Sequence, residues 1–325
     1  MSNSVNINRQ NAQPMPRSTY LIGLIIGVMA VSTGSIFIRF AQVEMPSLVI
    51  AAGRLSLATL FILPFAVHSW KINKISLSRK TLGLLILSGI FLGLHFITWV
   101  TSLEFTSVAS SVVLVTTAPL WVALLSPIFL KEKITKWALV GLGVALIGAI
   151  MVGMGGSCRV NDGQLICSGF ESFIEGEHIT GNLLALLGAI FSGAYLMVGR
   201  SVRNKLSLAM YTTIVYGIAS VVLILLVIIS GVKVTGYSSN MYWWVIGMAL
   251  IPQVIGHTTF NWALKYLSAA YVSIALLGEP IGAVILAALL LKEKPGILEI
   301  IGGILILLGI ILATQRALYK KNPPV

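Results

Sequence analysis

Three charged side chains fall inside long apolar runs of this sequence, which makes them the first candidates for chemistry. They are Glu279, Arg54 and Arg39. A charge at the centre of a helix in a bilayer costs about 2.5–3.5 kcal/mol, so a charge kept there is a functional candidate by default. A carboxyl group shielded from water can take up and release a proton near neutral pH. Glu279 is therefore a candidate proton-exchanging group.

Each of these charges also has a purely structural explanation. Arg39 lies near the end of its apolar run and can snorkel to the membrane interface. Arg54 can bond backbone carbonyls or a partner carboxylate, and Glu279 can hold helices together as a neutral or ion-paired group. Pro280 follows Glu279 directly, and Pro119 stands in an earlier run. Because proline removes a helix hydrogen bond, both prolines are candidate helix breaks.

A second set of candidates is polar rather than charged. Gln253, His257 and Asn261 follow one another at intervals of four residues, which places them on one face of a helix. A polar stripe in a lipid-embedded helix should face a cavity or another helix. Histidine titrates near neutral pH and suits proton exchange. Hydrogen bonding between helices, worth about 0.6–2 kcal/mol, is the alternative.

A fainter stripe in another apolar run contains His95 and Trp99. The rings of Trp99 and Tyr195 are of the kind that stacks on an organic molecule. Aromatic residues at helical spacing more often serve packing, so both explanations stay open. These side chains complete the set of candidate site residues.

The composition indicates what kind of structure must position these side chains. Of the 325 residues, 57% are hydrophobic and 10% are charged, and the mean hydropathy is +0.96. Soluble domains carry about 25% charged residues, so a soluble enzyme is excluded, and the high hydrophobicity excludes a disordered chain. About 20 apolar residues span a bilayer as a helix. The apolar runs predict ten such helices, at 19–41, 46–68, 81–103, 107–130, 134–155, 179–200, 208–231, 241–264, 269–291 and 296–316.

The basic residues predict how these helices are oriented. With the N-terminus inside, most of the 22 lysines and arginines fall on the inner side, as the positive-inside rule requires. Residues 1–18 and 317–325 are therefore expected to be cytoplasmic tails, the first of them disordered. The same rule explains the net charge of +12, so no nucleic-acid partner is expected.

The predicted outer loop, 156–178, contains the two cysteines of the chain, Cys158 and Cys167. In an oxidising outer compartment they can form a disulfide that closes a small loop, and two free thiols are the alternative. The sequence has no Walker A motif, no HExxH motif and no Cys/His cluster. Neither a cofactor nor a metal ion is therefore expected.

The sequence also contains an internal repeat. Residues 119–133 read PLWVALLSPIFLKEK and residues 280–294 read PIGAVILAALLLKEK, at an offset of 161 residues and without a gap. Five spans separate the copies, so the second copy must insert upside down. This is the inverted repeat typical of secondary transporters, with the substrate site between the halves. The two five-helix units are predicted at 19–155 and 179–316.

The chain resembles the EamA-type members of the drug/metabolite transporter superfamily, in its sequence motifs as well as in this duplication. The resemblance extends from residue 19 to about residue 316. It is carried by GSIFIRFA (34–41), AAGRLSLATL (51–60), GNLLALLGAIFSGAYLMVGR (181–200), NWALKYLSAAYVSIALLGEP (261–280) and LLLKEKPGILEIIGGILILLG (289–309). It implies ten helices, export or exchange of small metabolites, and no dedicated cofactor. It names no substrate, because the family is broad.

The expected function is secondary active transport across a plasma membrane of the bacterial type. The chain is expected to export an amino acid or a related small metabolite by proton-coupled alternating access. The alternatives are a uniporter, exchanger or importer of a phosphorylated or nucleotide-linked metabolite and, from a different class, an integral membrane enzyme or a receptor. The glycine-rich spans at 134–155 and 296–316 suit peripheral packing or a homodimer contact.

Overall fold

The apolar runs of the sequence fold as helices, because a helix satisfies its backbone N–H and C=O groups without water. The computed structural model describes residues 17–319, apart from gaps at 74–76, 123, 125–135, 156–157, 162–163, 168–175, 204, 268–271 and 273–274. The first half comprises α1 (Arg17–Ser32), α2 (Gly34–Ala41), α3 (Ser47–Asn73), α4 (Arg79–Phe105), α5 (Val108–Val115) and α7 (Lys136–Gly155). The second half comprises α9 (Glu177–Arg203), α10 (Leu208–Ser230), α11 (Ser239–Met248), the π-helix η1 (Ala249–His257), α12 (Thr258–Ala263), α14 (Gly278–Leu286), the π-helix η2 (Ala287–Leu291) and α15 (Ile297–Tyr319).

Five described helices are long and apolar enough to cross a membrane: Ser18–Ala41, Ser47–Ile72, Arg79–Phe105, Glu177–Arg203 and Leu208–Ser230. Four shorter apolar helices accompany them: Val108–Val122, Leu139–Val152, Gly278–Leu291 and Ile297–Leu312. The chain is therefore a multi-pass membrane protein. The count of ten spans and the cytoplasmic location of both termini stay predictions, and most of the two expected tails lies outside the described residues.

Local signals at the helix ends follow ordinary capping chemistry. The hydroxyl of Ser107 accepts a hydrogen bond from the backbone N–H of Ser110 at the start of α5, and Ser207 does the same for Met210 at the start of α10. Such caps satisfy N–H groups that have no partner within the helix. Helix α10 ends at Gly231, whose φ of 65° lies in the left-handed region that glycine tolerates.

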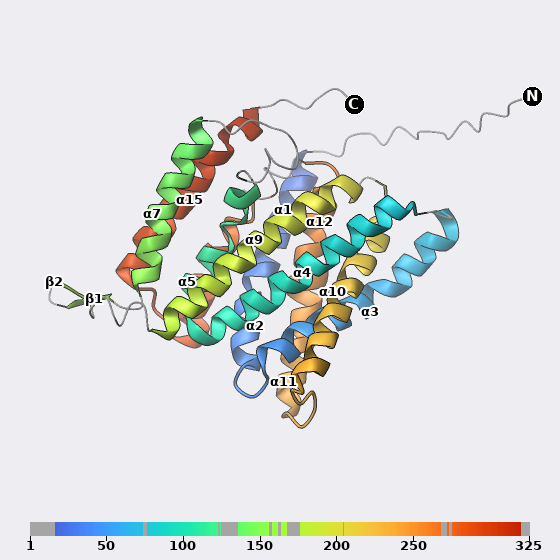
Figure 1. Ribbon diagram of the computed structural model, residues 1–325, viewed down its shortest axis with the longest axis horizontal. Coiled ribbons are helices and arrows are strands. Elements are labelled where there is room, and N and C mark those ends of the chain that lie inside the picture. The colour runs from blue at the N-terminus through green and yellow to red at the C-terminus, as the bar shows by residue number, and fades with distance from the viewer. Residues whose placement is uncertain are drawn as a thin grey trace, which may run out of the picture.

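The first helices of the two halves run in opposite directions. Helices α2 and α4 end side by side. Arg39 near the end of α2 donates a hydrogen bond to the carbonyl of Thr106, the residue that caps α4. Helix α9 begins at that same end, where Thr106 donates to Asn182. We call this the hairpin end, and we call the opposite end, where α1 begins and α15 ends, the terminus end (Figure 1). The first helix of the second half is therefore antiparallel to the first helix of the first half.

A short β-hairpin interrupts the otherwise helical fold, and it was not predicted from the sequence. Strand β1 (Cys158–Asn161) pairs with β2 (Gln164–Cys167) in antiparallel fashion, with Cys158 directly opposite Cys167. The hairpin extends from the bundle beyond the end of α7 (Figure 1). This register brings the two cysteine positions together in the backbone, but their side chains lie outside the described part of the chain. The disulfide stays a prediction.

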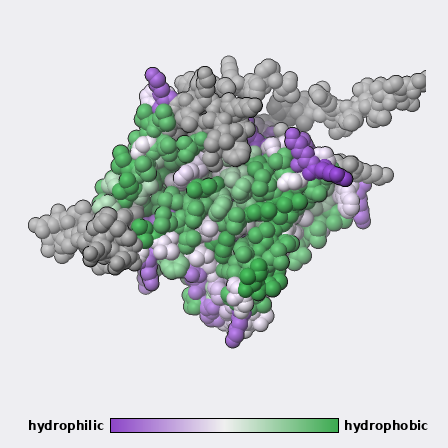
Figure 2. All heavy atoms as spheres, in the orientation of Figure 1, coloured by the Kyte–Doolittle hydropathy of each residue, from purple (hydrophilic) through white to green (hydrophobic). Residues whose placement is uncertain are grey.

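The outer surface of the bundle is apolar along its sides. Large hydrophobic side chains such as Phe65, Ile228 and Leu289 are 69%, 68% and 72% exposed. On the face shown in Figure 2, hydrophobic residues cover the middle and hydrophilic residues gather at the ends. A soluble monomer rarely exposes such a surface, whereas lipid tails cover it at no cost.

Helices α7 and α15 form a tightly packed pair through glycine. A Cβ atom built on Gly148 would lie 2.5 Å from the carbonyl oxygen of Gly302, and one built on Gly309 would lie 2.6 Å from the carbonyl oxygen of Gly141. Close backbone contact of this kind is how small residues join membrane helices. The two glycine-rich faces therefore meet each other within one chain, and a homodimer stays a prediction.

We expect Gly148→Ala to lower the thermal unfolding temperature, because the added methyl group overlaps the backbone of α15. Overpacking of this kind costs about 1–3 kcal/mol. The control is Gly143→Ala in the same helix, whose added Cβ would meet no described atom within 4 Å. Thermal unfolding of both variants in detergent measures the difference, and equal stabilities would contradict the packing described for α7 and α15.

Candidate functional site

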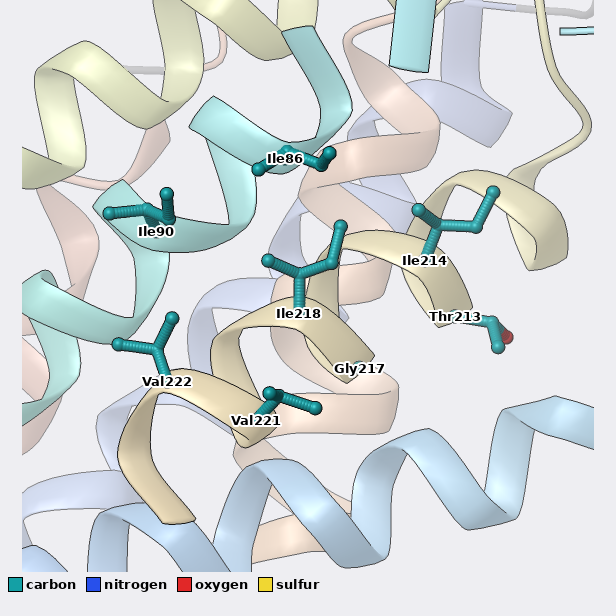
Figure 3. A pocket seen from close by; sticks show the side chains of 8 residues that line it. All are labelled: Ile86, Ile90, Thr213, Ile214, Gly217, Ile218, Val221 and Val222. Atoms are coloured by element: carbon teal, nitrogen blue, oxygen red, sulfur yellow. The ribbon is translucent and has the colours of Figure 1, made fainter. Parts of the chain in front are cut away.

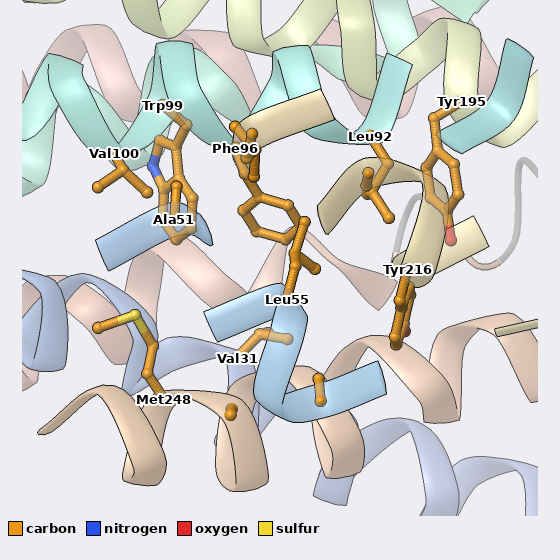
Figure 4. Packing of buried hydrophobic residues seen from close by; sticks show 14 of the residues in the cluster. Val31, Ala51, Leu55, Leu92, Phe96, Trp99, Val100, Tyr195, Tyr216 and Met248 are labelled. Carbon is orange, nitrogen blue, oxygen red and sulfur yellow. The ribbon is translucent and has the colours of Figure 1, made fainter. Parts of the chain in front are cut away.

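Arg54 lies at the centre of the candidate site, on helix α3 and fully buried. Its Nε donates a 2.8 Å hydrogen bond to Oε1 of Gln253 on η1. Its guanidinium carbon lies 4.2 Å from the ring centroid of Phe96 and 5.8 Å from that of Trp99, both on α4. In Figure 4 these two rings point from α4 toward α3. Arg54 is thus held between helices of both halves by one hydrogen bond and two cation–π contacts.

Glu279 lies in the first turn of α14 and is 8% exposed. Its backbone carbonyl accepts a 3.3 Å hydrogen bond from the hydroxyl of Ser32 on α1, so the two halves meet here. Its carboxyl group interacts electrostatically with Arg54. The one salt bridge found among the described residues joins other side chains, so Glu279 is near Arg54 without a direct ion pair. The repeat offset pairs Glu279 with Ala118, so the first half has no equivalent carboxyl group.

The two candidate prolines stand just after interruptions of their helices. Helix α5 ends at Val115, residues 116–117 form a turn, and helical residues resume before Pro119. Similarly, residues 276–277 form a turn before α14, whose third residue is Pro280. Proline is tolerated in the first turn of a helix, where its missing N–H has no partner to lose. Each proline therefore begins a helical segment after a break, at equivalent positions of the two halves.

The stripe of Gln253, His257 and Asn261 differs from the single helical face expected from the sequence. Gln253 and His257 lie in the π-helix η1, whereas Asn261 lies in α12. The N–H of Thr258 bonds the carbonyl of Gln253, five residues back, and so follows the wider π pattern. Gln253 and Asn261 are buried, but His257 is half-buried. Pro252 inside η1 removes one ordinary helix hydrogen bond, which gives a physical reason for the wider turn.

Asn261 is the centre of a hydrogen-bond network. Its Oδ1 accepts a 2.6 Å bond from the hydroxyl of Tyr195, and its Nδ2 donates a 3.2 Å bond to the hydroxyl of Tyr216. Its backbone carbonyl accepts a 2.8 Å bond from Nε of Arg203. Tyr195 is thus tied to α12 through its hydroxyl. Tyr216 and Arg203 were not singled out from the sequence, because nothing in their spacing separates them from ordinary packing and loop residues.

His95 and His257 both lie against one aromatic ring. The ring of His95 lies 4.8 Å from that of Phe96, and the ring of His257 lies 5.4 Å from it on another side. His95 Nδ1 forms a 2.9 Å hydrogen bond with the carbonyl of Gly188, and its ring stacks on Trp99. Phe96 and His257 are equivalent positions of the repeat, so the two halves meet at this ring.

A polar network joins the halves at the hairpin end. Arg39 forms a 3.0 Å salt bridge with Glu293, which follows η2. The other carboxylate oxygen of Glu293 accepts a 3.0 Å bond from the backbone N–H of Val108, at the start of α5. Glu299 accepts hydrogen bonds from the hydroxyls of Ser107 and Ser110. Arg39 is therefore paired across the two halves and does more than snorkel toward an interface.

Glu44 and Ser238 add a further link at this end. Glu44 lies between α2 and α3, and Ser238 precedes α11. The backbone N–H and the hydroxyl of Ser238 each donate a 2.8 Å bond to the carboxylate. These two bonds hold the pKa of Glu44 below its ordinary value. None of these partners could be found from the sequence, because the paired residues lie 185 or more positions apart.

An apolar groove on the side of the bundle is separate from this site. It has a volume of about 430 Å³ and lies between α4 and α10 (Figure 3). Its lining residues are Ile86, Ile90, Thr213, Ile214, Gly217, Ile218, Val221 and Val222. It contains one hydroxyl group and no charge, so it has no means of binding a polar molecule specifically.

Comparisons with known proteins agree with this architecture. The model of the EamA-like transporter family matches the chain twice, over residues 18–154 and 179–315. A Bacillus subtilis (strain 168) protein named as the uncharacterized transporter YxxF is 25% identical over 307 residues, which cover 94% of this chain and 93% of that protein. A protein from Streptantibioticus cattleyicolor, named as a probable terminal-alkyne amino-acid exporter, is 26% identical over 64% of this chain and 65% of its own length.

One solved structure supports the fold. It superimposes with a TM-score of 0.62 at 16% sequence identity and covers 94% of this chain and 100% of the other. At this identity the likeness concerns the fold alone. The family match covers most of the chain and recurs at the same offset as the internal repeat. The chain therefore belongs to the EamA-like transporter family.

Proposed function

We propose that this chain is a secondary active transporter that exports an amino acid or a related small metabolite in exchange for protons, across a bacterial-type plasma membrane. Two matches to the family model, whose first helices are antiparallel, support transport by alternating access. The substrate class is supported by the relative from Streptantibioticus cattleyicolor, whose name describes a probable amino-acid exporter. The hairpin end is the outer end in this proposal.

The buried carboxyl group of Glu279 is the observation that supports proton exchange. It is the one acidic side chain among the buried residues that the structure describes. It lies against α1 of the other half and within electrostatic range of Arg54. Protonation of this carboxyl group would change the charge balance at the contact between the halves. A proton could thereby bias which conformation the halves adopt, and ionisable groups inside membrane proteins commonly mark such relays.

We expect Glu279→Gln to abolish accumulation driven by a pH gradient, because glutamine cannot bind and release a proton. The assay measures uptake of a radiolabelled mixture of the common L-amino acids into proteoliposomes, with and without an imposed gradient. Driven uptake should fall about tenfold or more, whereas exchange of labelled for unlabelled amino acid without a gradient should persist. Glu177→Gln, at an exposed position of α9, is the matched control. Full retention of driven uptake in Glu279→Gln would refute proton exchange at this residue.

The network at the hairpin end is the proposed outer closure. The Arg39–Glu293 salt bridge, the bond from Val108 and the bonds from Ser107 and Ser110 to Glu299 all cross from one half to the other. The halves cannot separate at this end without breaking them. The side chains of Arg39 and Glu293 are 27% and 29% exposed, so the pair is worth about 0.2–1 kcal/mol. Such a modest energy suits a contact that must open in every cycle.

We expect Arg39→Glu to favour opening at the hairpin end, because it places two negative charges side by side. The measurement is the rate of maleimide labelling of Val112→Cys, a fully buried position one turn into α5 from Val108, in a Cys158→Ser/Cys167→Ser background. Labelling should rise about two- to fivefold, as expected for a pair of this exposure. The exchanged pair Arg39→Glu/Glu293→Arg should restore slow labelling. Equal rates in all three proteins would show that this pair does not hold the end closed.

A further inference from the structure

Arg54 is buried without enough partners. Its Nη1 and Nη2 atoms have no hydrogen-bond acceptor anywhere in the described ranges, although neither touches solvent. Nε2 of Gln253 is likewise buried and without an acceptor there. Because arginine is only a donor, Gln253 must turn its oxygen toward Arg54, which leaves its NH₂ group pointing elsewhere. These nitrogen atoms, joined through one 2.8 Å bond, form a cluster of donors.

The surroundings of this donor cluster are aromatic. Phe96 covers one face of the guanidinium at 4.2 Å, and the ring of Trp99 lies at 5.8 Å. Nε1 of Trp99 is a further buried donor that no described residue accepts from. Gly34 on α2 completes the wall, because a Cβ built there would lie 3.4 Å from Trp99 and 3.9 Å from Nη1 of Arg54. The cluster therefore faces mostly aromatic surface, and no described residue places an acceptor within hydrogen-bond distance of these nitrogen atoms.

Arg203 shows what a structural arginine looks like in this fold. It is 2% exposed and also lies near an aromatic ring, that of Tyr211. However, its Nε donates to the carbonyl of Asn261 at 2.8 Å and its Nη1 donates to the carbonyl of Leu206 at 2.9 Å. A buried charge without such bonds destabilises a protein strongly. Within the described part of the chain, neither Nη group of Arg54 has an acceptor, which a structural role does not explain.

The geometry points to a bidentate carboxylate as the ligand of Arg54, and we propose that the transported molecule is bound there through its carboxylate group. This inference rests on the proposed transport function and names the substrate chemistry of the same site. The planar fork of Nη1 and Nη2 matches the two oxygens of a carboxylate, and the amide of Gln253 supplies a further donor. The rings of Phe96 and Trp99 then take the apolar part of the molecule.

A monoanion fits this site better than a phosphate. Arg54 is the one fully buried cation among the described residues that faces it, and the charge of Glu279 lies within electrostatic range. A phosphate dianion would meet one positive charge and one nearby carboxyl group. A carboxylate needs a single counter-charge, which Arg54 supplies. Because Arg54 is fully buried in this conformation, the ligand enters when the halves separate.

The test measures binding to the full-length protein in lipid nanodiscs by calorimetry. The probes are L-phenylalanine, hydrocinnamate, phenethylamine and inorganic phosphate, which separate the carboxylate, the amine and the phosphate. We expect L-phenylalanine and hydrocinnamate to bind wild type, and phenethylamine and phosphate to bind at least about tenfold more weakly. Preferential binding of phosphate or of the amine, or no binding of either carboxylate, would overturn the proposal.

Two variants assign the binding to Arg54. Arg54→Lys keeps the positive charge but loses the planar fork, so affinity for both carboxylate probes should fall about tenfold or more. Arg203→Lys is the matched control and should lower thermal stability while carboxylate affinity stays within about twofold. Unchanged affinity in Arg54→Lys refutes the site. If Arg54→Lys does not fold, Gln253→Leu serves as the second variant. It should lower the affinity for both carboxylate probes without creating affinity for phenethylamine.

The transport assay distinguishes failure of the site from failure of the function. Carboxylate binding that depends on Arg54, together with no transport driven by a pH gradient, would leave the site standing and refute proton exchange. Driven transport of amino acids in Arg54→Lys at the wild-type Michaelis constant would refute the site and leave the function standing.

Discussion

The structure is arranged around the cost of holding a guanidinium group away from water. Arg54 on α3 can remain buried because η1 supplies the oxygen of Gln253 and α4 supplies the rings of Phe96 and Trp99. These contacts hold α3 against α4 of the same half and against η1 of the second half. They satisfy the guanidinium only in part, because the apolar packing around it contains few acceptors. This incomplete hydrogen bonding of a buried charge distinguishes the centre of the bundle from an ordinary hydrophobic core.

The irregular helices help to position the polar groups. In η1 the π pattern places Gln253 beside Arg54, while Asn261 on the following α12 bonds Tyr195 and Tyr216. An α-helix with four-residue steps would carry both groups on one face, as the sequence suggested. The breaks before Pro119 and Pro280 act similarly, because a helix that restarts can change direction without losing many hydrogen bonds. Irregular backbone is tolerated at this depth where protein surrounds it.

Much of the architecture could be predicted from the sequence, but the pairs of residues that contact each other across the two halves could not. Hydrophobic runs and the offset of 161 residues predicted helices and a duplication, and the quoted sequence motifs carried the resemblance to the family. Arg54 and Glu279 were found because a charge in an apolar run is conspicuous. The partner of Arg39 was not found, since Glu293 is far away in sequence and sits in an ordinary polar loop. Arg203 was not singled out, because it follows the apolar run at 179–200, although the fold buries it at the end of α9.

The duplication did not reproduce Glu279, whose equivalent is Ala118. Two copies of one unit therefore contain a single buried acidic group among the described residues. If this group couples transport to protons, each cycle moves one proton for each substrate molecule. At that stoichiometry the pH difference by itself sustains a concentration ratio of at most about tenfold for each pH unit, since one proton crosses it in each cycle. The asymmetry of the repeat would thus limit how steep a gradient this chain can build.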